Sequence, residues 1–167
     1  MEYGKVRTSA IGHLGRVVDE TFREHARLFS ENKNLWLIGG TAREVFVNWR
    51  RRILSRHFAS SPKAPADVDF VLIDFGQQHW PPELAEFDLQ TAETVEKYMN
   101  TRDLAINEIL LRPDWLIYSK DAEMAADNEM YGMPSEYELN QSFSRELLPR
   151  TAMRSLNTSL ELGGEVD

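Results

Sequence analysis

The segment from Pro65 to Phe75, PADVDFVLIDF, constrains the fold of this chain more than any other. Its run of Val, Phe, Leu and Ile is typical of a core β-strand, yet Asp67 and Asp69 stand at its beginning. Because side chains alternate across a strand, the two carboxylates project to the same face and can reach one point. Two bare carboxylates repel each other, so one would take up a proton unless a cation lies between them. The pattern indicates either a solvated strand end or a site for a hard divalent ion such as Mg²⁺.

A second unit joins a short strand to a helix through two glycines. The apolar run Leu35–Ile38 is too short for a helix and predicts a buried strand, which Gly39 and Gly40 follow as a tight turn. We expect Thr41 to be the N-cap of a helix, since apolar residues then recur every three or four positions. Glycines admit a ligand close to the backbone, and the amides of a first helical turn bind phosphate oxygens. The unit is either a plain turn or a phosphate site to which Arg43 adds a bidentate contact.

The other face of this helix is basic. It carries Arg50, Arg51, Arg52 and Arg56, and Lys63 follows in the next loop. Such a cluster is either the solvated side of a helix or a contact for the phosphates of an acceptor. The formal net charge of -8, from 27 acidic and 19 basic residues, argues against a protein that coats nucleic acid or membrane by bulk charge. Any nucleic-acid contact must therefore be local.

The remaining chain completes the prediction of a small mixed sheet flanked by helices, an α/β (α+β) fold. The expected elements are an amphipathic helix from Thr8 to Phe29, a strand from Glu86 to Gln90, a strand from Trp115 to Tyr118 and a helical segment from Ser144 to Leu162. Residues 94–111 mix helical and strand signals. The connection to residues 86–90 is short enough to make this strand an antiparallel partner of the aspartate strand, with Asp88 opposite its apolar face.

Length and composition narrow the class of protein. A chain of 167 residues with 42% hydrophobic content has the size of one ordinary domain. The chain has no cysteine, which excludes disulfides and thiolate metal sites, so any metal must be held by oxygen or histidine ligands. No apolar stretch approaches the roughly 20 residues of a membrane span. We expect a cytoplasmic protein with no membrane partner.

Three motifs, taken in order, carry a resemblance to a known family. LIGGTARE at residues 37–44 looks like a GGxxR turn, DVDF at 67–70 looks like a metal-binding DxD, and TRDLAIN at 101–107 is similar to an RRDFTIN motif. Together they resemble the nucleotidyltransferases of the DNA polymerase beta superfamily, and within it the head domain of bacterial-type tRNA CCA-adding enzymes and poly(A) polymerases. The chain departs from the pattern at Thr101, which replaces an Arg, and at Thr151, which replaces the Asp of the family's base template.

The resemblance implies a site and a reaction. Asp67 and Asp69, with Asp88 from a context similar to the family's FEIT, would be catalytic and hold two Mg²⁺ ions. The residues implied to bind a nucleoside triphosphate (NTP) are Gly39, Gly40, Arg43, Arg102, Asp103, Asn107 and Arg154. We therefore expect one nucleotidyltransferase-like domain over residues 1–167, with an N-terminal helix in 1–34, a catalytic core in 35–125 and a helical segment in 138–162. It would transfer a nucleoside monophosphate from NTP to an acceptor hydroxyl, with an RNA 3′ end, tRNA-like, as the expected acceptor.

Alternatives stay open for the acceptor and for activity itself. The acceptor could be a small molecule or a protein, and the domain could be a catalytically silent module that binds a nucleotide or a partner. The family's RNA-binding domains would follow Asp167, so an RNA acceptor could be held through a separate RNA-binding subunit. The choice of NTP is also open, because the template motif is altered.

Overall fold

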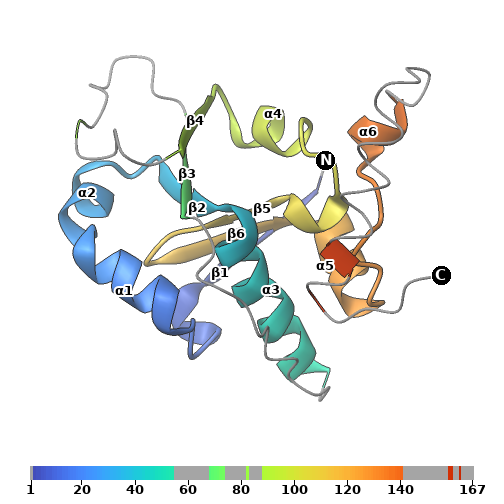
Figure 1. Ribbon diagram of the computed structural model, residues 1–167, viewed down its shortest axis with the longest axis horizontal. Coiled ribbons are helices and arrows are strands. Elements are labelled where there is room, and N and C mark those ends of the chain that lie inside the picture. The colour runs from blue at the N-terminus through green and yellow to red at the C-terminus, as the bar shows by residue number, and fades with distance from the viewer. Residues whose placement is uncertain are drawn as a thin grey trace.

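The computed structural model describes residues 2–54, 68–73, 82, 88–140, 158–159 and 162. Within them the chain forms one mixed sheet of six strands with helices packed against it (Figure 1), which confirms the expected α/β class. The strands are β1 (Tyr3–Arg7), β2 (Leu35–Ile38), β3 (Asp69–Ile73), β4 (Asp88–Ala92), β5 (Ile109–Leu111) and β6 (Trp115–Ser119). The helices are α1 (Arg16–Glu24), α2 (Ala26–Glu31), α3 (Gly39–Ile53), α4 (Val95–Met99), α5 (Lys120–Asp127) and α6 (Glu136–Asn140), with 3-10 turns at Thr8–Ala10 and Ala105–Asn107.

The strand order across the sheet is β1-β6-β5-β2-β3-β4, and β3 and β4 form its parallel pair. The expected antiparallel pairing of these two strands is therefore wrong. A parallel pair needs a crossover of about a dozen residues, and residues 74–87 are long enough to supply one. The length of the connecting segment therefore did not determine whether β3 and β4 run parallel or antiparallel. The other four strand pairs are antiparallel, as the neighbouring chain directions require.

Alternation along the strands builds two hydrophobic cores, one on each face of the sheet. In β2, Leu35 and Leu37 belong to the larger core, which packs against α1, α2, α3 and α5. Trp36 and Ile38 belong to the smaller core, which packs against α4 through Tyr98. Figure 1 shows α4 on the opposite side of the sheet from α1 and α3. Burial on both faces explains why β2 and β3 read as continuous apolar runs.

The N-terminal region differs from the single helix expected for residues 8–29. It begins with strand β1, which pairs with β6, and its helical part is divided into α1 and α2. Gly12 and Gly15 have φ angles of +85° and +97°, a left-handed conformation that interrupts the interior of a right-handed helix. The helix therefore begins only after Gly15. The expectation that residues 1–34 contribute only a helix is wrong for the same reason.

The C-terminal half adds a helix that periodicity did not reveal. Ser119 caps α5 by accepting a hydrogen bond from the amide of Ala122 at 2.9 Å. The buried side of this short helix consists of alanines, whose small apolar surface gives a weak periodic signal. The strand expected at residues 115–118 is confirmed as β6, and residues 94–111 resolve into α4, a 3-10 turn and β5. Most of the helical segment expected at residues 144–162 lies outside the described residues.

Across the described part of the chain, no helix is both long and apolar enough to cross a membrane.

Candidate functional site

The candidate site lies at the edge of the sheet where β2 ends and β3 and β4 begin. Ile38, the last residue of β2, is in register with Asp69, the first residue of β3. Asp69 is in turn in register with Asp88, the first residue of β4. Parallel pairing therefore sets these two aspartates on adjacent strands, about 4.8 Å apart along the backbone hydrogen-bonding direction. Asp67 lies outside the described residues.

Gly39 lies directly against the Asp69 carboxylate. Its φ angle is +81°, and a Cβ atom built on it would lie 2.8 Å from Asp69 Oδ2. Only glycine combines this backbone conformation with so close an approach. Helix α3 already begins at Gly39, with Ile38 at the N-cap position, so the expected Thr41 N-cap is wrong. Thr41 is instead a buried residue of the first helical turn.

The first turn of α3 carries the predicted phosphate-binding residues. A Cβ atom at Gly40 would lie 3.6 Å from a guanidinium nitrogen of Arg43, so the arginine folds back beside the glycine. Arg43 is half-buried and donates a hydrogen bond of 3.2 Å from Nη1 to Asn107 Oδ1. The start of a helix of 15 residues supplies backbone amides and a partial positive charge to an anion beside it. The arrangement can accept phosphate oxygens.

Asn107 connects Arg43 to Asp103. Its Nδ2 donates to Asp103 Oδ1 at 3.2 Å, and the same oxygen accepts the backbone amide of Leu104 at 2.9 Å. The segment is a 3-10 turn anchored by the buried Ile106, rather than an α-helix. Asp103 and Asn107, which the resemblance implies to bind nucleotide, therefore lie side by side.

Arg102 is directed toward β4 and α4. It donates to Gln90 Oε1 from Nη1 and to the carbonyl of Tyr98 from Nε, both at 3.2 Å, and its guanidinium lies 4.2 Å from the centre of the Tyr98 ring. Burial raises the pKa of Tyr98 to about 12, and the negative charges of Asp69 and Asp103 act in the same direction. Tyr98 therefore keeps its proton at neutral pH and lies within electrostatic reach of both carboxylates.

Gln90 and Tyr98 are the two residues at this site that the sequence motifs do not include. Gln90 stands two positions after Asp88 on the same strand, a spacing that could have identified it once Asp88 was a candidate. Tyr98 had no comparable signal, because its place depends on how α4 packs on the sheet. Arg154, implied by the resemblance to bind the base, lies outside the described residues.

The arginines of the basic face expected on α3 mostly make hydrogen bonds within the fold. The prediction that this face is solvated is therefore wrong for them. Arg50 donates two hydrogen bonds to the carboxylate of Asp127 on α5, at 2.7 and 2.8 Å. Arg51 is buried and donates to the Tyr131 hydroxyl, and Arg52 donates to the backbone carbonyl of Ile11. Arg56 and Lys63 lie outside the described residues. These three arginines are therefore poor candidates for an acceptor's phosphates.

The donor chemistry of the site suits a hard divalent cation. Mg²⁺ is commonly held by one or two carboxylates together with water and substrate phosphates. In the described ranges, no group of three or more His, Cys, Asp or Glu residues could hold a metal ion, and Asp67 falls in a gap between those ranges. Asp69 beside the first turn of α3, with Asp88 in register, fits a cation that is shared with bound phosphate.

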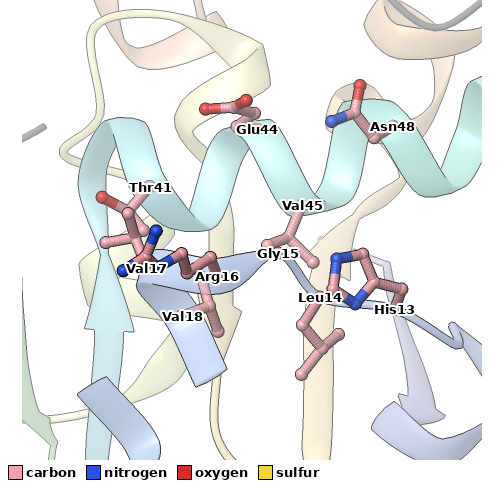
Figure 2. Close-up of a pocket in the computed structure, with 10 residues that line it drawn as sticks. All are labelled: His13, Leu14, Gly15, Arg16, Val17, Val18, Thr41, Glu44, Val45 and Asn48. Carbon is pink, nitrogen blue, oxygen red and sulfur yellow. The ribbon is translucent and has the colours of Figure 1, made fainter. Parts of the chain in front are cut away.

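A separate pocket of about 130 Å³ lies between the segment before α1 and the first half of α3. Figure 2 shows Val45 on α3 directed toward the segment that contains His13 and Leu14, and Glu44 and Asn48 of α3 also line the pocket. The pocket shares Thr41 with the first turn of α3 but has none of the carboxylates described above among its lining residues. It is therefore distinct from the candidate site, and the sequence motifs did not predict it.

A scan against protein-family models and searches of curated proteins and of solved structures find no match. The resemblance to nucleotidyltransferases therefore rests on the three motifs in the sequence.

Proposed function

We propose that this protein is a metal-dependent nucleotidyltransferase that transfers a nucleoside monophosphate from NTP to an acceptor hydroxyl. The observation that carries the proposal is the position of Asp69, whose carboxylate touches Gly39 where α3 begins. A carboxylate and a helical first turn together offer ligands for a cation and for the phosphates that the cation accompanies. Asp88, in register with Asp69, adds a second carboxylate residue to the same edge of the sheet.

Each residue has a defined part in this proposal. Asp69 and Asp88, with Asp67, would hold Mg²⁺, which lowers the pKa of the attacking hydroxyl and neutralises charge at the reacting phosphorus. The amides of Gly39 and Gly40 and the guanidinium of Arg43 would bind the triphosphate. Asn107 orients Arg43 by accepting its hydrogen bond, which reduces the freedom lost when phosphate binds.

The reaction is a substitution at the α-phosphorus. The acceptor oxygen forms a bond to this phosphorus as the bond to the oxygen that bridges to the β-phosphate breaks, and pyrophosphate leaves. The proton of the hydroxyl passes to solvent. Positioning and electrostatic stabilisation dominate catalysis in phosphoryl transfer, so the residues that orient the triphosphate are as important as the carboxylates.

The test incubates the protein with each α-labelled NTP, Mg²⁺ and total RNA, and separates labelled RNA, protein and metabolites. The variants Asp69→Asn and Asp88→Asn remove a negative charge with little change in volume, and Asp19→Asn on α1 is the matched control. Loss of a few kcal/mol of charge stabilisation corresponds to at least about a hundredfold in rate. We expect that loss in both site variants and less than a twofold change in the control.

The acceptor class follows from the fraction that carries the label. Label in RNA supports an RNA 3′ end, and label in protein or in small molecules supports the corresponding alternative acceptor. No transfer to any fraction with Mg²⁺ or Mn²⁺ would contradict the enzymatic proposal and favour a silent binding module.

A further inference from the structure

The face of the sheet that carries Asp69 continues to the opposite edge of the molecule. Asp69 is in register with Ile38, and the pairing of Leu37 with Leu111 brings Ile38 beside Leu110 on β5. Leu110 is in register with Ile117 on β6, and Ile117 with Lys5 on β1. One row of residues on a single face of the sheet therefore runs from Asp69 on β3 to Lys5 on β1. Four strand spacings of about 4.8 Å separate the two ends, or about 19 Å.

The far end of this face combines an aromatic ring with two cations. Trp115 and Ile117 are half-buried at the margin of the smaller core, whose centre is covered by α4. Lys5 and Arg7 are exposed, and their charged groups lie 4.3 and 4.0 Å from the centre of the Trp115 ring. We call Lys5, Arg7, Trp115 and Ile117 the β1 face. β1 is an edge strand of the sheet. The β1 face lies on the same side of the sheet as α4, at the end that α4 does not cover.

The two cations of the β1 face form no ion pair with any residue in the ranges that the structure describes. Two other exposed lysines of this acidic chain have a carboxylate partner: Lys97 pairs with Glu93, and Lys120 pairs with Glu2. Asp114, adjacent to Trp115, is engaged by Arg112 at 3.0 Å. The β1 face therefore presents local positive charge on a protein whose net charge is -8.

We propose that the β1 face binds single-stranded RNA. Its identification as the acceptor site rests on the proposed function. Single strands are bound by cations that contact phosphates and by aromatic rings on which bases stack, and Lys5, Arg7 and Trp115 supply both. The middle of the row, Ile38 and Leu110, is buried under α4, so the RNA contacts only the exposed end of this face. A duplex would require a larger basic surface than two side chains provide.

The test measures binding of a fluorescein-labelled RNA of 12 nucleotides by fluorescence anisotropy, without NTP and without metal. The double variant Lys5→Glu/Arg7→Glu reverses both charges at exposed positions, and Arg23→Glu/Lys33→Glu, also exposed, makes the same charge change elsewhere. We expect the first variant to weaken binding at least tenfold and the control less than threefold. The slope of log K against log salt should fall by about 1.4, because two phosphate contacts are lost at about 0.7 each.

Stacking is tested separately with Trp115→Leu, which keeps an apolar side chain against the smaller core and removes the ring. We expect at least fivefold weaker binding, with the far-UV circular dichroism spectrum unchanged. Equal weakening in the control variant, equal binding of a poly-glutamate peptide, or no RNA binding by the parent protein would overturn the proposal. RNA binding that depends on the β1 face without any nucleotidyl transfer would leave this surface standing and remove the proposed function. Nucleotidyl transfer to RNA that these variants leave unchanged would contradict RNA binding by the β1 face and would leave the proposed function standing.

Discussion

Gly39 has a backbone conformation and a close neighbour that a larger side chain would disturb. Its positive φ angle is one that L-residues adopt at a cost of about 1–2 kcal/mol, and its missing Cβ leaves room for Asp69. Gly40, the next residue, has ordinary space around its Cα, since the nearest atom to a Cβ there would be 3.6 Å away. The pair of glycines is therefore unequal, although they look alike in the sequence.

This inequality predicts different results for the two alanine variants. Gly39→Ala should lower the free energy of unfolding by about 2 kcal/mol or more and displace the Asp69 carboxylate. Gly40→Ala should change it by less than about 1 kcal/mol. Urea denaturation of both variants compares them, and similar losses would show that the conformation of Gly39 is not special.

Glu108 is the second residue with a measurable consequence, because this acidic residue is only 1% exposed. Burial raises its pKa from 4.5 to about 7, although the Ser119 hydroxyl donates a hydrogen bond of 2.7 Å to it. The folded state therefore holds a proton that the unfolded state releases between these pH values. The contribution of Glu108 to stability is greatest below pH 4.5 and falls as the pH rises toward 7.

The variant Glu108→Gln keeps an acceptor for Ser119 and removes the charge. We expect it to be more stable than the parent protein at pH 8, by about 3 kcal/mol, and indistinguishable from it at pH 4. Thermal or urea unfolding at the two pH values measures the difference. A constant difference at both pH values would mean that Glu108 does not titrate in this range.

At the scale of elements, Arg112 joins α2 to β2 from the turn between β5 and β6. It is buried and donates three hydrogen bonds of 2.8 Å to the backbone carbonyls of Phe29, Asn32 and Leu35. These carbonyls lie near the end of α2 and the beginning of β2, where the regular backbone hydrogen bonding of helix and strand is interrupted. The Arg112 side chain thus supplies hydrogen-bond donors to backbone carbonyls at both the end of the helix and the start of the strand.

Removing this side chain should destabilise the fold strongly. Arg112→Ala removes three hydrogen bonds to backbone carbonyls, although Asn32 O keeps the one it accepts from the Leu35 amide, so at about 1 kcal/mol each we expect a loss of about 2–3 kcal/mol. Arg16→Ala is the contrasting variant, because Arg16 is exposed and pairs with Glu20 one turn along α1. This exposed pair is screened by solvent, so its loss should leave the midpoint of urea denaturation almost unchanged. Comparable losses in the two variants would contradict this account.

At the scale of the whole molecule, ligand binding should be visible as stability. A ligand present at a hundred times its dissociation constant stabilises a folded protein by about 2.7 kcal/mol. For a chain of this size, that corresponds to a rise in Tm of roughly 5–10 °C. We expect such a rise with NTP and Mg²⁺, its reversal by EDTA, and its absence in Asp69→Asn. A rise that EDTA and the Asp69→Asn variant leave unchanged would place the ligand elsewhere.

Local patterns sufficed for the parts of the site that lie within one strand or one turn. The apolar runs predicted β2, β3 and β6, and the glycine pair predicted where α3 begins to within three residues. Each of these features depends on neighbours only a few positions apart, whose chemistry is legible in the sequence. The roles of Asp67 and Arg154 stay predictions, because both lie outside the described residues.

Only the tertiary structure decided the direction of β4, the recruitment of β1 and the partners of the α3 arginines. Asp69 meets Asp88 through a parallel pairing, and Arg50 meets Asp127 across 77 positions of sequence. Strand direction and ion pairing are chosen among distant segments by the burial they achieve together, and no local period encodes that choice. The sequence by itself determined which residues are candidates to bind a cation and a phosphate, whereas long-range packing determined which of them stand side by side.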